Sequence, residues 1–409
     1  MVPLECGLIG EKLGHSFSPA IHRKLADYDY RLVELAPEEL GPFLEKGQFR
    51  GLNVTIPYKK AVIPYCQALT DQARRIGSVN TIVRRRDGSL LGHNTDYDGF
   101  RYLLTSAGAQ VAGRKALVLG TGGVSLTVHT VLQDLNVGEQ VSISRTGRDN
   151  YQNLDRHADA QIIVNATPVG MYPEVEDTPV APSLFPHLEG AFDLIYNPLK
   201  TMFLLEAERR GLCRSNGLGM LVAQAKAAAE LFLDRKLPAE KVEEITREME
   251  RSARNLVLVG MPGCGKTTVG RALARQLGRT LVDLDQRIEE EAGRPIPEIF
   301  AREGEEAFRR LEHRILCRVA RESGQVVATG GGIVTRRDNW APIRQNSTVI
   351  FLRRPLDQLP VEGRPLSLTH PLEELYRQRL PLYEEIADWT VDNVTVDGAV
   401  SEIVRRLEL

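Results

Sequence analysis

The feature that most constrains this chain is the octapeptide Gly260-Met261-Pro262-Gly263-Cys264-Gly265-Lys266-Thr267, which follows an apolar run and precedes a helical stretch. The pattern G-x-x-x-x-G-K-T between a strand and a helix indicates a phosphate-binding loop. Its backbone amides cradle phosphates, Lys266 reaches the β and γ groups, and the Thr267 hydroxyl binds Mg²⁺. We therefore expect ATP and Mg²⁺ to be held by Gly260, Gly263, Gly265, Lys266, Thr267 and Thr268.

A second glycine-rich loop, Gly120-Thr121-Gly122-Gly123-Val124-Ser125, also stands between a predicted strand (116–119) and a helix. Gly120 permits a tight turn, Gly122 lets the backbone approach a pyrophosphate, and Ser125 is small enough for helix and strand to pack. An ordinary tight turn is the alternative, but the context is that of a dinucleotide site. We expect the cofactor to contact Gly120, Gly122, Gly123 and Ser125.

The next predicted strand, 140–144, leads into Ser144-Arg145-Thr146, with no acidic residue at its tip. An acid at this point binds the ribose hydroxyls of NAD, whereas an Arg and a hydroxyl suit the 2′-phosphate of NADP. The sequence therefore predicts NADP rather than NAD, with Ser144, Arg145 and Thr146 as further cofactor-binding residues.

Length and composition limit the remaining possibilities. A chain of 409 residues, 42% hydrophobic and 26% charged, is expected to form two or three globular domains. The net charge of −2 provides no field for nucleic acid or an anionic membrane, so we expect small-molecule partners. Five scattered cysteines, no signal peptide and no apolar run of about 18 residues favour a cytoplasmic protein.

Short apolar runs alternate with amphipathic stretches, which predicts an α/β fold with parallel sheets. In the first block, strands are expected at 6–10 and 51–56, a helix headed by Ser18-Pro19 with Ser18 as its cap, a helix that carries Lys59, and a hairpin at 78–92. Later strands are expected at 161–165 and 191–196. An Ala-rich helix ending at Leu233 should pack back on the first block, and a charged helix at 238–252 leads into a strand at 255–259 almost without a linker.

Polar residues of the first block gather at strand ends and helix starts. They are Ser16, Ser18, Asn53, Thr55, Lys59, Asn80 and Asp96. Hydroxyls and amides in such places can hold a carboxylate and several hydroxyl groups, and a Lys beside an Asp can move a proton. Taken singly, each residue is more often a cap, a turn residue or a surface charge.

The order of these segments resembles that of shikimate dehydrogenases. The matching motifs are Gly14-His15-Ser16-Phe17-Ser18-Pro19, Asn53-Val54-Thr55-Ile56-Pro57-Tyr58-Lys59, Gly77-Ser78-Val79-Asn80-Thr81, Asn94-Thr95-Asp96, Asn165-Ala166-Thr167-Pro168-Val169-Gly170-Met171, Asp193-Leu194-Ile195-Tyr196-Asn197-Pro198 and Gly217-Leu218-Gly219-Met220-Leu221-Val222-Ala223-Gln224-Ala225. Together they cover residues 6–252 and are highly specific.

The resemblance implies reduction of 3-dehydroshikimate by NADPH, with Lys59 and Asp96 as the proton-transferring pair. Ser16 and Ser18 would hold the substrate carboxylate. The other implied substrate contacts are Thr55, Asn80, Asp96, Tyr196 and Gln224, and Gly217 would contact the cofactor. Two positions depart from the family: Leu126 stands where an Arg is common, and Ser144 where the signature has Asn.

The last part of the chain places carboxylates and arginines after the phosphate loop. Asp283 and Asp285 end the next strand, and Arg309, Gly330-Gly331-Gly332, Arg364 and Arg379 follow. Such a set suits an anionic polyol acceptor, and its order resembles shikimate kinases. The resemblance implies that Asp285, Arg309, Gly331 and Arg379 hold shikimate, that Asp283 acts on Mg²⁺ through water, and that Arg364 closes on the phosphoryl group from a lid that is shorter than usual.

The sequence therefore predicts a bifunctional enzyme that converts 3-dehydroshikimate to shikimate and then to shikimate 3-phosphate. We expect a substrate-binding domain at 1–96 and 217–253, a Rossmann NADP-binding domain at 97–216, and a P-loop kinase domain with a parallel sheet at 254–409. One alternative is a quinate-type dehydrogenase joined to another small P-loop kinase. A metabolite sensor that has lost catalysis is another.

Overall fold

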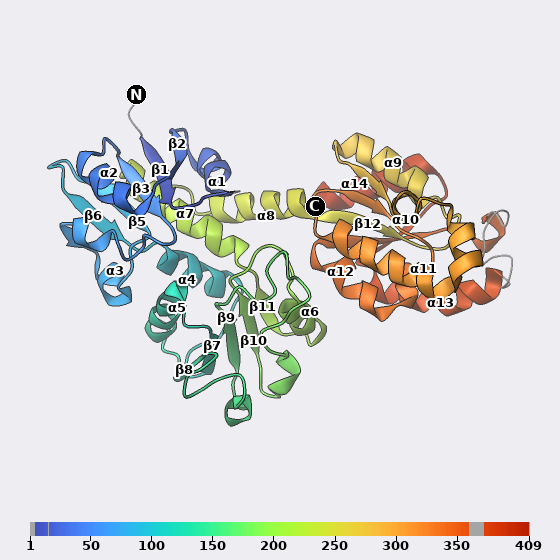
Figure 1. Cartoon of the computed structure of the whole chain (residues 1–409), viewed down its shortest axis with the longest axis horizontal. Helices are drawn as coiled ribbons and strands as arrows, with labels where there is room; N and C mark the ends of the chain where they lie inside the picture. Colours follow the sequence, from blue (N-terminus) through green and yellow to red (C-terminus); the bar gives the residue numbers. More distant parts are fainter. Residues whose placement is uncertain (1–4, 15, 360–371, 409) are drawn as a thin grey trace. The chain divides into compact units, whose positions relative to one another are not determined.

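The computed structural model describes residues 5–14, 16–359 and 372–408. Its contacts divide the chain into two compact units (Figure 1). The first comprises Met1–Met171, Asp177–Tyr196 and Glu206–Glu248, and the second comprises Tyr172–Glu176, Asn197–Leu205 and Met249–Leu409. The division falls inside two helices, α6 (Met202–Arg209) and α8 (Lys241–Ala253).

The first unit contains a mixed six-stranded sheet in the order β2-β1-β3-β5-β6-β4. Its strands are β1 (Cys6–Gly10), β2 (Tyr30–Glu34), β3 (Gly51–Val54), β4 (Ala68–Leu69), β5 (Thr81–Arg84) and β6 (Leu90–His93). The predicted hairpin is present as the antiparallel pair β5–β6. Short helices accompany this sheet: α1 (Ser18–Leu25), α2 (Leu40–Lys46) and α3 (Asp71–Ile76).

Two local predictions for this region are wrong. No helix carries Lys59, because residues 56–62 form consecutive turns before a single 3₁₀ turn at Ile63–Tyr65. Ser18 does not cap α1 either. It is the first helical residue, and the Ser16 hydroxyl accepts its N–H at 3.2 Å. The turn after β3 therefore positions Lys59, and the N-terminus of α1 is stabilised from two residues upstream.

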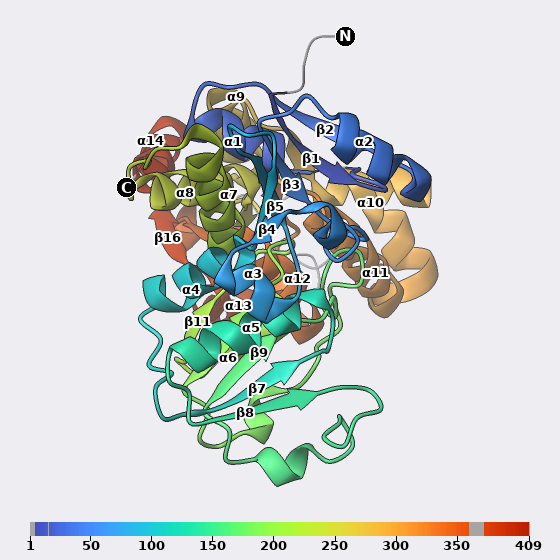
Figure 2. The same ribbon diagram turned by 90° about the vertical axis from the view of Figure 1, so that its left-hand side faces the viewer.

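The first unit also contains a five-stranded parallel sheet in the order β11-β10-β9-β7-β8. Its strands are β7 (Lys115–Leu119), β8 (Glu139–Ile143), β9 (Ile162–Asn165), β10 (Gly190–Asp193) and β11 (Cys213–Ser215). The helices are α4 (Asp96–Ser106), α5 (Gly123–Asp134) and α7 (Leu218–Leu233), with the second half of α6 (Met202–Arg209). Figure 2 shows α5 beside β7 and β8, and α7 packs against α1, α4, β3 and β5.

Strand β10 is shorter than predicted. It ends at Asp193 rather than at Tyr196, because the buried Asp193 carboxylate accepts the N–H of Ile195 at 3.0 Å and starts a turn. The side chain of Asn165, at the end of β9, donates to the same carboxylate at 3.1 Å. The ends of the two neighbouring strands are therefore joined by a buried polar contact.

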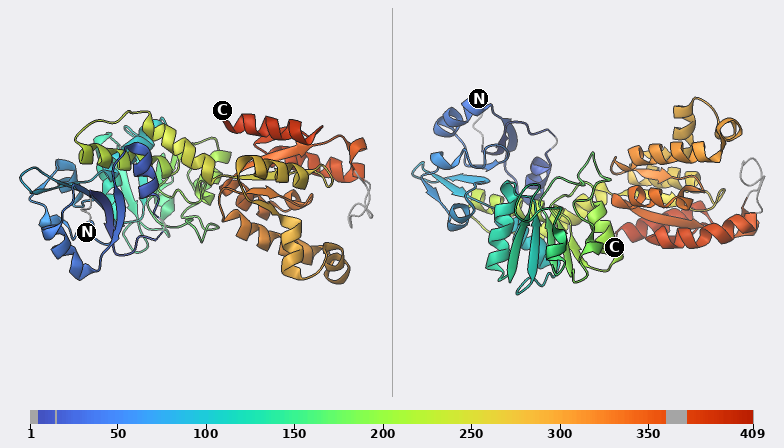
Figure 3. Two further views of the ribbon diagram at one scale, coloured as in Figure 1. Left: turned by 90° about the horizontal axis from the view of Figure 1, so that it is seen from above. Right: turned by 60° about the horizontal axis from the view of Figure 1, so that its bottom comes forward.

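The second unit is built on a parallel sheet in the order β13-β14-β12-β15-β16. Its strands are β12 (Asn255–Val259), β13 (Leu281–Asp283), β14 (Val326–Ala328), β15 (Ser347–Arg353) and β16 (Trp389–Asp392). Its helices are α9 (Lys266–Leu277), α10 (Leu284–Ala292), α11 (Ile296–Ala320), α12 (Trp340–Gln345), α13 (Leu372–Ile386) and α14 (Val396–Glu408). Helices α9 and α14 pack together, and Figure 3 shows the sheet between its helices.

Apolar strands explain both parallel sheets. Strand β12 is buried along its whole length, and β7 is buried from Ala116 to Leu119, as expected for strands covered on both faces. Each sheet contributes to a separate hydrophobic cluster. Within the described ranges, no helix has the length and apolar character that crossing a bilayer would require.

The packing of α7 on the first sheet generates a stability prediction. A side chain at Gly51 would overlap the ring of Phe232, which is fully buried. We expect Gly51→Ala to lower the free energy of unfolding of the first unit by about 1–3 kcal/mol, because the core cannot accept the extra methyl group. Calorimetric unfolding of the full chain measures the effect. Gly219→Ala is the matched control, since its methyl group would meet Tyr102 at an ordinary 3.4 Å; equal unfolding temperatures for the two variants would contradict the packing argument.

Candidate active sites

Lys59 and Asp96 form a close ion pair in the first unit. Lys59 lies in the turn after β3, and Asp96 is the first residue of α4. The Nζ–Oδ2 distance is 2.6 Å, and the two side chains are 26% and 13% exposed. The Lys59 carbonyl accepts the N–H of Val79 at 2.8 Å, which fixes the turn against the segment before β5. The arrangement places a proton donor, balanced by a carboxylate, where a bound molecule can still reach it.

Asn80 stands next to this pair in a fully determined orientation. Its Oδ1 accepts the backbone N–H of Thr95 at 2.7 Å and the Thr95 hydroxyl at 3.2 Å. Because an N–H can only donate, the atom facing Thr95 must be the carbonyl oxygen, and the Asn80 NH₂ group faces the other way. That group makes no hydrogen bond to any residue in the described part of the chain, so it is available to a ligand. Thr95 belongs to a motif noted in the sequence, but its role beside Asn80 was missed.

The other predicted substrate residues lie on four segments of the same unit. Thr55 follows β3, and Ser16 and Ser18 lie at the start of α1. Tyr196 meets Phe17 edge to face, with ring centroids 5.8 Å apart, and burial raises the pKa of Tyr196, so its hydroxyl stays protonated. Gln224, on α7, lies against Gly99 of α4, three residues after Asp96. Direct contacts join Lys59 to Asp96 and Asn80 to Thr95. Thr55 belongs to the segment that leads from β3 to Lys59, and Gln224 lies against α4, the helix that begins at Asp96.

The loop between β7 and α5 fits a pyrophosphate. Gly120 has a φ of +97°, and a Cβ there would lie 2.8 Å from the Thr167 methyl group, so only glycine is accommodated. Gly122 and Gly123, in contrast, face open space at the N-terminus of α5. The Ser125 hydroxyl donates to the Gly122 carbonyl at 2.6 Å and keeps the loop compact. Free amides and open space at a helix N-terminus suit an anionic dinucleotide.

The tip of β8 presents the predicted phosphate-binding residues to solvent. The Ser144 hydroxyl accepts the N–H of Gly147 at 2.8 Å, which shapes the loop, while Arg145 and Thr146 are exposed. A pocket of about 540 Å³ opens beside this loop and is also lined by Arg148, which sequence reasoning missed. Gly217, predicted to contact the cofactor, donates its N–H to the Ile195 carbonyl at 2.9 Å.

The phosphate loop of the second unit joins β12 to α9. Lys266 is the first residue of α9 and is 8% exposed; its Nζ donates to the carbonyls of Gly260 and Met261, each at 2.9 Å. Gly263 and Gly265 have positive φ angles, and Thr268 lines the same pocket as the loop. The loop carbonyls thus hold the Lys266 ammonium until phosphates replace them as partners.

Asp283 and Thr267 form a set of oxygen ligands at the end of β13. Thr267 Oγ1 donates to Asp283 Oδ2 at 2.7 Å, and Asp283 Oδ1 caps α10 by accepting the N–H of Asp285 at 3.1 Å. Hydroxyl and carboxylate oxygens are the hard ligands that Mg²⁺ prefers beside nucleotide phosphates. These residues therefore fit a magnesium ion.

Three consecutive glycines after β14 are each required by a different neighbour. A Cβ at Gly330 would lie 2.8 Å from Glu312 Oε1 and 2.9 Å from Asp285 Oδ1. A Cβ at Gly331 would lie 2.6 Å from the Pro262 ring, and one at Gly332 would overlap the Arg309 guanidinium. The triplet lets two carboxylates, an arginine and the phosphate loop approach one stretch of backbone.

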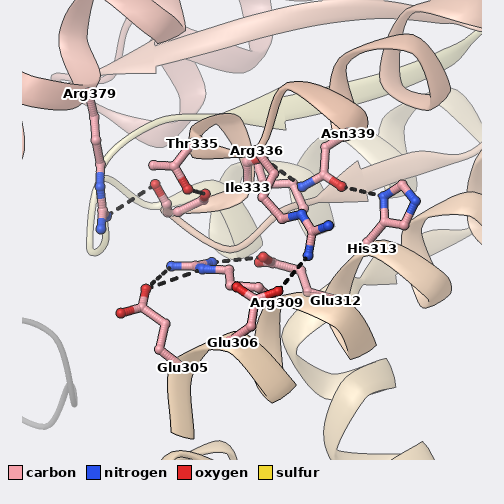
Figure 4. A network of polar contacts seen from close by, with 12 residues as sticks. Glu305, Glu306, Arg309, Glu312, His313, Ile333, Thr335, Arg336, Asn339 and Arg379 are labelled. Carbon is pink, nitrogen blue, oxygen red and sulfur yellow. Dashed lines mark hydrogen bonds and ion pairs between the residues drawn. The ribbon is translucent and has the colours of Figure 1, made fainter.

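Arg309 and Glu312 form a buried ion pair in α11. Arg309 Nη1 donates to Glu312 Oε2 at 2.7 Å, and the side chains are 7% and 1% exposed. Figure 4 shows Arg309 between Glu312 and Glu305. Burial raises the pKa of Glu312 despite the neighbouring guanidinium, and its Oε1 has no hydrogen-bond partner among the described residues. Glu312 was missed, because one Glu among many on a charged helix carries no sequence signal.

One pocket of about 750 Å³ contains both groups of residues in the second unit. It is lined by Lys266, Thr267, Asp285, Arg309 and Gly331, together with Arg379 of α13. Arg379 is 5% exposed, and its Nη1 donates to the Gly331 carbonyl at 3.3 Å. Desolvation raises the pKa of Asp285. The predicted lid residue Arg364 lies outside the described residues.

Family models match two parts of the chain. The model described as "Shikimate dehydrogenase substrate binding domain" matches residues 8–82, and the one described as "Shikimate kinase" matches residues 262–408. A shikimate dehydrogenase (NADP(+)) of Clostridium beijerinckii is 38% identical over 254 residues, which are 56% of this chain and 94% of the relative. That of Moorella thermoacetica is 36% identical over 271 residues, 59% of this chain and 92% of the relative.

Solved structures resemble the same part of the chain. A chorismate mutase/shikimate 5-dehydrogenase fusion protein from Clostridium acetobutylicum aligns with a TM-score of 0.57 and 34% identity, covering 61% of this chain and 98% of its own. The shikimate 5-dehydrogenase of Thermus thermophilus in complex with NADP(H) and shikimate aligns with a TM-score of 0.55 and 32% identity, covering 60% and 99%.

The buried ion pair generates a prediction for the second unit. We expect Glu312→Ala to destabilise this unit by about 3–5 kcal/mol, because the buried Arg309 loses its compensating charge. Glu306→Ala is the control, since Glu306 is largely exposed and its ion pairs with Arg310 and Arg336 are 3.5 Å and 3.6 Å long. Denaturant unfolding of the full chain, followed at the transition of the second unit, compares the variants. A Glu312→Ala protein as stable as Glu306→Ala would refute this account of the pair.

Proposed function

Because the chain belongs to the shikimate dehydrogenase family and carries a shikimate kinase domain over residues 262–408, we propose that it catalyses two consecutive reactions. The first reduces 3-dehydroshikimate to shikimate with NADPH and a proton, which leaves NADP⁺, and the second transfers a phosphoryl group from ATP to a hydroxyl of shikimate, which leaves ADP and a proton. The product of the first reaction is the acceptor of the second. A quinate-type dehydrogenase joined to another small P-loop kinase is less favoured, because no acidic residue follows Ser144 and because Arg309, Gly331 and Arg379 line one pocket. An inactive sensor is less favoured, because both sites retain their ionisable residues.

In the dehydrogenase site, the close contact of Lys59 with Asp96 carries the proposal. Bound NADPH supplies the hydride that reduces the substrate carbonyl. Lys59 donates a proton to the carbonyl oxygen as negative charge develops there, and Asp96 holds the Lys59 ammonium in place. The Asn80 NH₂ group donates to a ring hydroxyl, and Ser16 and Ser18 hold the carboxylate. Thr55, Tyr196 and Gln224 complete the substrate site.

In the kinase site, the pocket that contains both the phosphate loop and Arg309 carries the proposal. Asp285 accepts a hydrogen bond from a shikimate hydroxyl, while Arg309, Arg379 and the backbone of Gly331 hold the rest of the acceptor. Lys266 moves from the loop carbonyls to the transferred phosphate, and Thr267 and Asp283 hold Mg²⁺. Arg364 would contact the phosphoryl group.

The domain limits and the compartment are part of the proposal. We assign substrate binding to 1–96 and 217–253, since α7 packs on α1, β3 and β5. We assign NADP binding to residues 97–216, which contain the sheet formed by β7 to β11, and phosphorylation of shikimate to residues 254–409. All five cysteines are free, which fits a reducing cytoplasm.

The two sites should fail independently. Lys59→Ala should lower dehydrogenase turnover by about 10²–10⁴-fold, the range for loss of a general acid, and leave kinase turnover unchanged. Lys266→Ala should do the reverse. Lys60→Ala, at an exposed neighbouring lysine, is the control. Coupled assays of NADPH oxidation and ADP release on the same preparations measure both activities, and a folded variant that loses both would exclude independent sites.

The dehydrogenase should prefer NADP. Arg145 is exposed at the tip of β8, where a guanidinium can pair with the 2′-phosphate. We expect Arg145→Ala to raise the KM for NADPH by about tenfold or more and to leave the KM for NADH unchanged. Arg156→Ala, an exposed arginine farther along the same segment, should change neither. Equal kcat/KM of the unmodified chain for both cofactors would contradict this assignment.

A further inference from the structure

A network of hydrogen-bonded polar side chains crosses the first sheet behind the dehydrogenase site. The Tyr30 hydroxyl donates to Asn53 Oδ1 at 2.8 Å, Asn53 Nδ2 donates to Thr81 Oγ1 at 3.1 Å, and Thr81 Oγ1 donates to Asn80 Oδ1 at 3.1 Å. The Asn53, Thr81 and Asn80 side chains are at most 5% exposed. Buried polar groups of this kind persist only when each has a hydrogen-bond partner, so the network fixes several side chains at once.

Backbone atoms determine which group donates and which accepts in this network. Asn53 Nδ2 also faces the Asn80 carbonyl at 3.5 Å, and a carbonyl can only accept. The other amide atom of Asn53, Oδ1, must therefore face Tyr30, which has to donate. Burial raises the pKa of Tyr30 well above its usual value, so the hydroxyl keeps its proton. At the far end, Asn80 uses Oδ1 to accept from Thr81 and Thr95, and only its NH₂ group is left for a ligand.

Tyr30 also contacts the helix that carries a predicted carboxylate ligand. Its ring stacks on His22 of α1, with centroids 3.8 Å apart and planes 10° apart, and the Ser18 hydroxyl lies beside its own. His22 and Ser18 are four residues apart and so share one face of α1. Burial lowers the pKa of His22 to about 3, so the stacked ring is neutral.

We propose that Tyr30 is a positioning residue of the dehydrogenase site. Its hydroxyl, acting through Asn53 and Thr81, holds the Asn80 NH₂ group toward a substrate ring hydroxyl, and its ring packs on His22 of α1, the helix that carries Ser18. The inference rests on the proposed function and deepens it. It assigns substrate recognition to a residue at the edge strand β2, outside every motif that the sequence singled out.

Tyr30→Phe in the full chain tests the inference. It removes the hydroxyl and retains the ring. We expect the KM for 3-dehydroshikimate to rise about tenfold, the effect of one lost hydrogen bond, while kcat, the KM for NADPH and kinase turnover change less than twofold. Tyr28→Phe is the matched control, because the Tyr28 hydroxyl contacts His22 and does not belong to the network of Tyr30, Asn53, Thr81 and Asn80. A merely structural role for Tyr30 would not produce this division between KM and kcat.

Two further comparisons complete the test. In an Asn80→Ala background, Tyr30→Phe should change the KM clearly less than in the unmodified chain, since its path through Asn53 and Thr81 ends at Asn80 and only the contact with the Ser18 hydroxyl remains to be lost. If Tyr30→Phe does not fold, Thr81→Val should raise the KM about tenfold and Thr81→Ser, which keeps the hydroxyl, should not. An unchanged KM in Tyr30→Phe, or a full tenfold effect without Asn80, would overturn the inference alone. An unmodified chain that cannot reduce 3-dehydroshikimate would overturn the proposed function and this inference with it.

Discussion

Both sites depend on one constraint. The backbone must come close to side chains or ligands at positions where a Cβ would collide. Gly330, Gly331 and Gly332 let Glu312, Pro262 and Arg309 converge on one loop, and Gly120 does the same beside Thr167. Gly122 and Gly123 leave open space instead, at the N-terminus of α5. Parallel strands bring such loops to one edge of a sheet, so short glycine stretches become anion sites without any contribution from their own side chains.

Charge in both sites is stabilised before any ligand binds. Lys59 faces Asp96, Lys266 faces two loop carbonyls, and Arg309 faces Glu312. An isolated buried charge would cost several kcal/mol, so the buried Lys266 and Arg309 depend on their partners, whereas Lys59 is 26% exposed and its partner mainly orients it. Lys266 differs from the others, since carbonyl partners are easily exchanged for phosphate oxygens. Its partners can therefore change during a reaction, while the Arg309–Glu312 pair serves as a fixed support.

Sequence patterns predicted most of the fold and the residue types of both sites. The apolar runs predicted strands β7, β9 and β12 to within a residue or two, because strands buried on both faces are largely apolar. The edge strand β8 was predicted equally closely, although only Val141 and Ile143 are buried. Predictions failed where a side chain decided the local backbone. The turns around Lys59, the early end of β10 at Asp193 and the contact of Ser16 with the first residue of α1 each depend on one hydrogen bond or one turn that periodicity does not encode.

The sequence by itself determined the two glycine loops, the phosphate-binding lysine and the order of motifs, because these are local patterns in which neighbouring residues act together. Only the tertiary structure decided which distant residues meet. It placed Lys59 against Asp96, 37 positions away, joined Tyr30 to Asn80 through two buried side chains, and set Glu312 behind Arg309 and Gly330. Such contacts arise from strand order and helix packing, so no segment of the chain carries them alone.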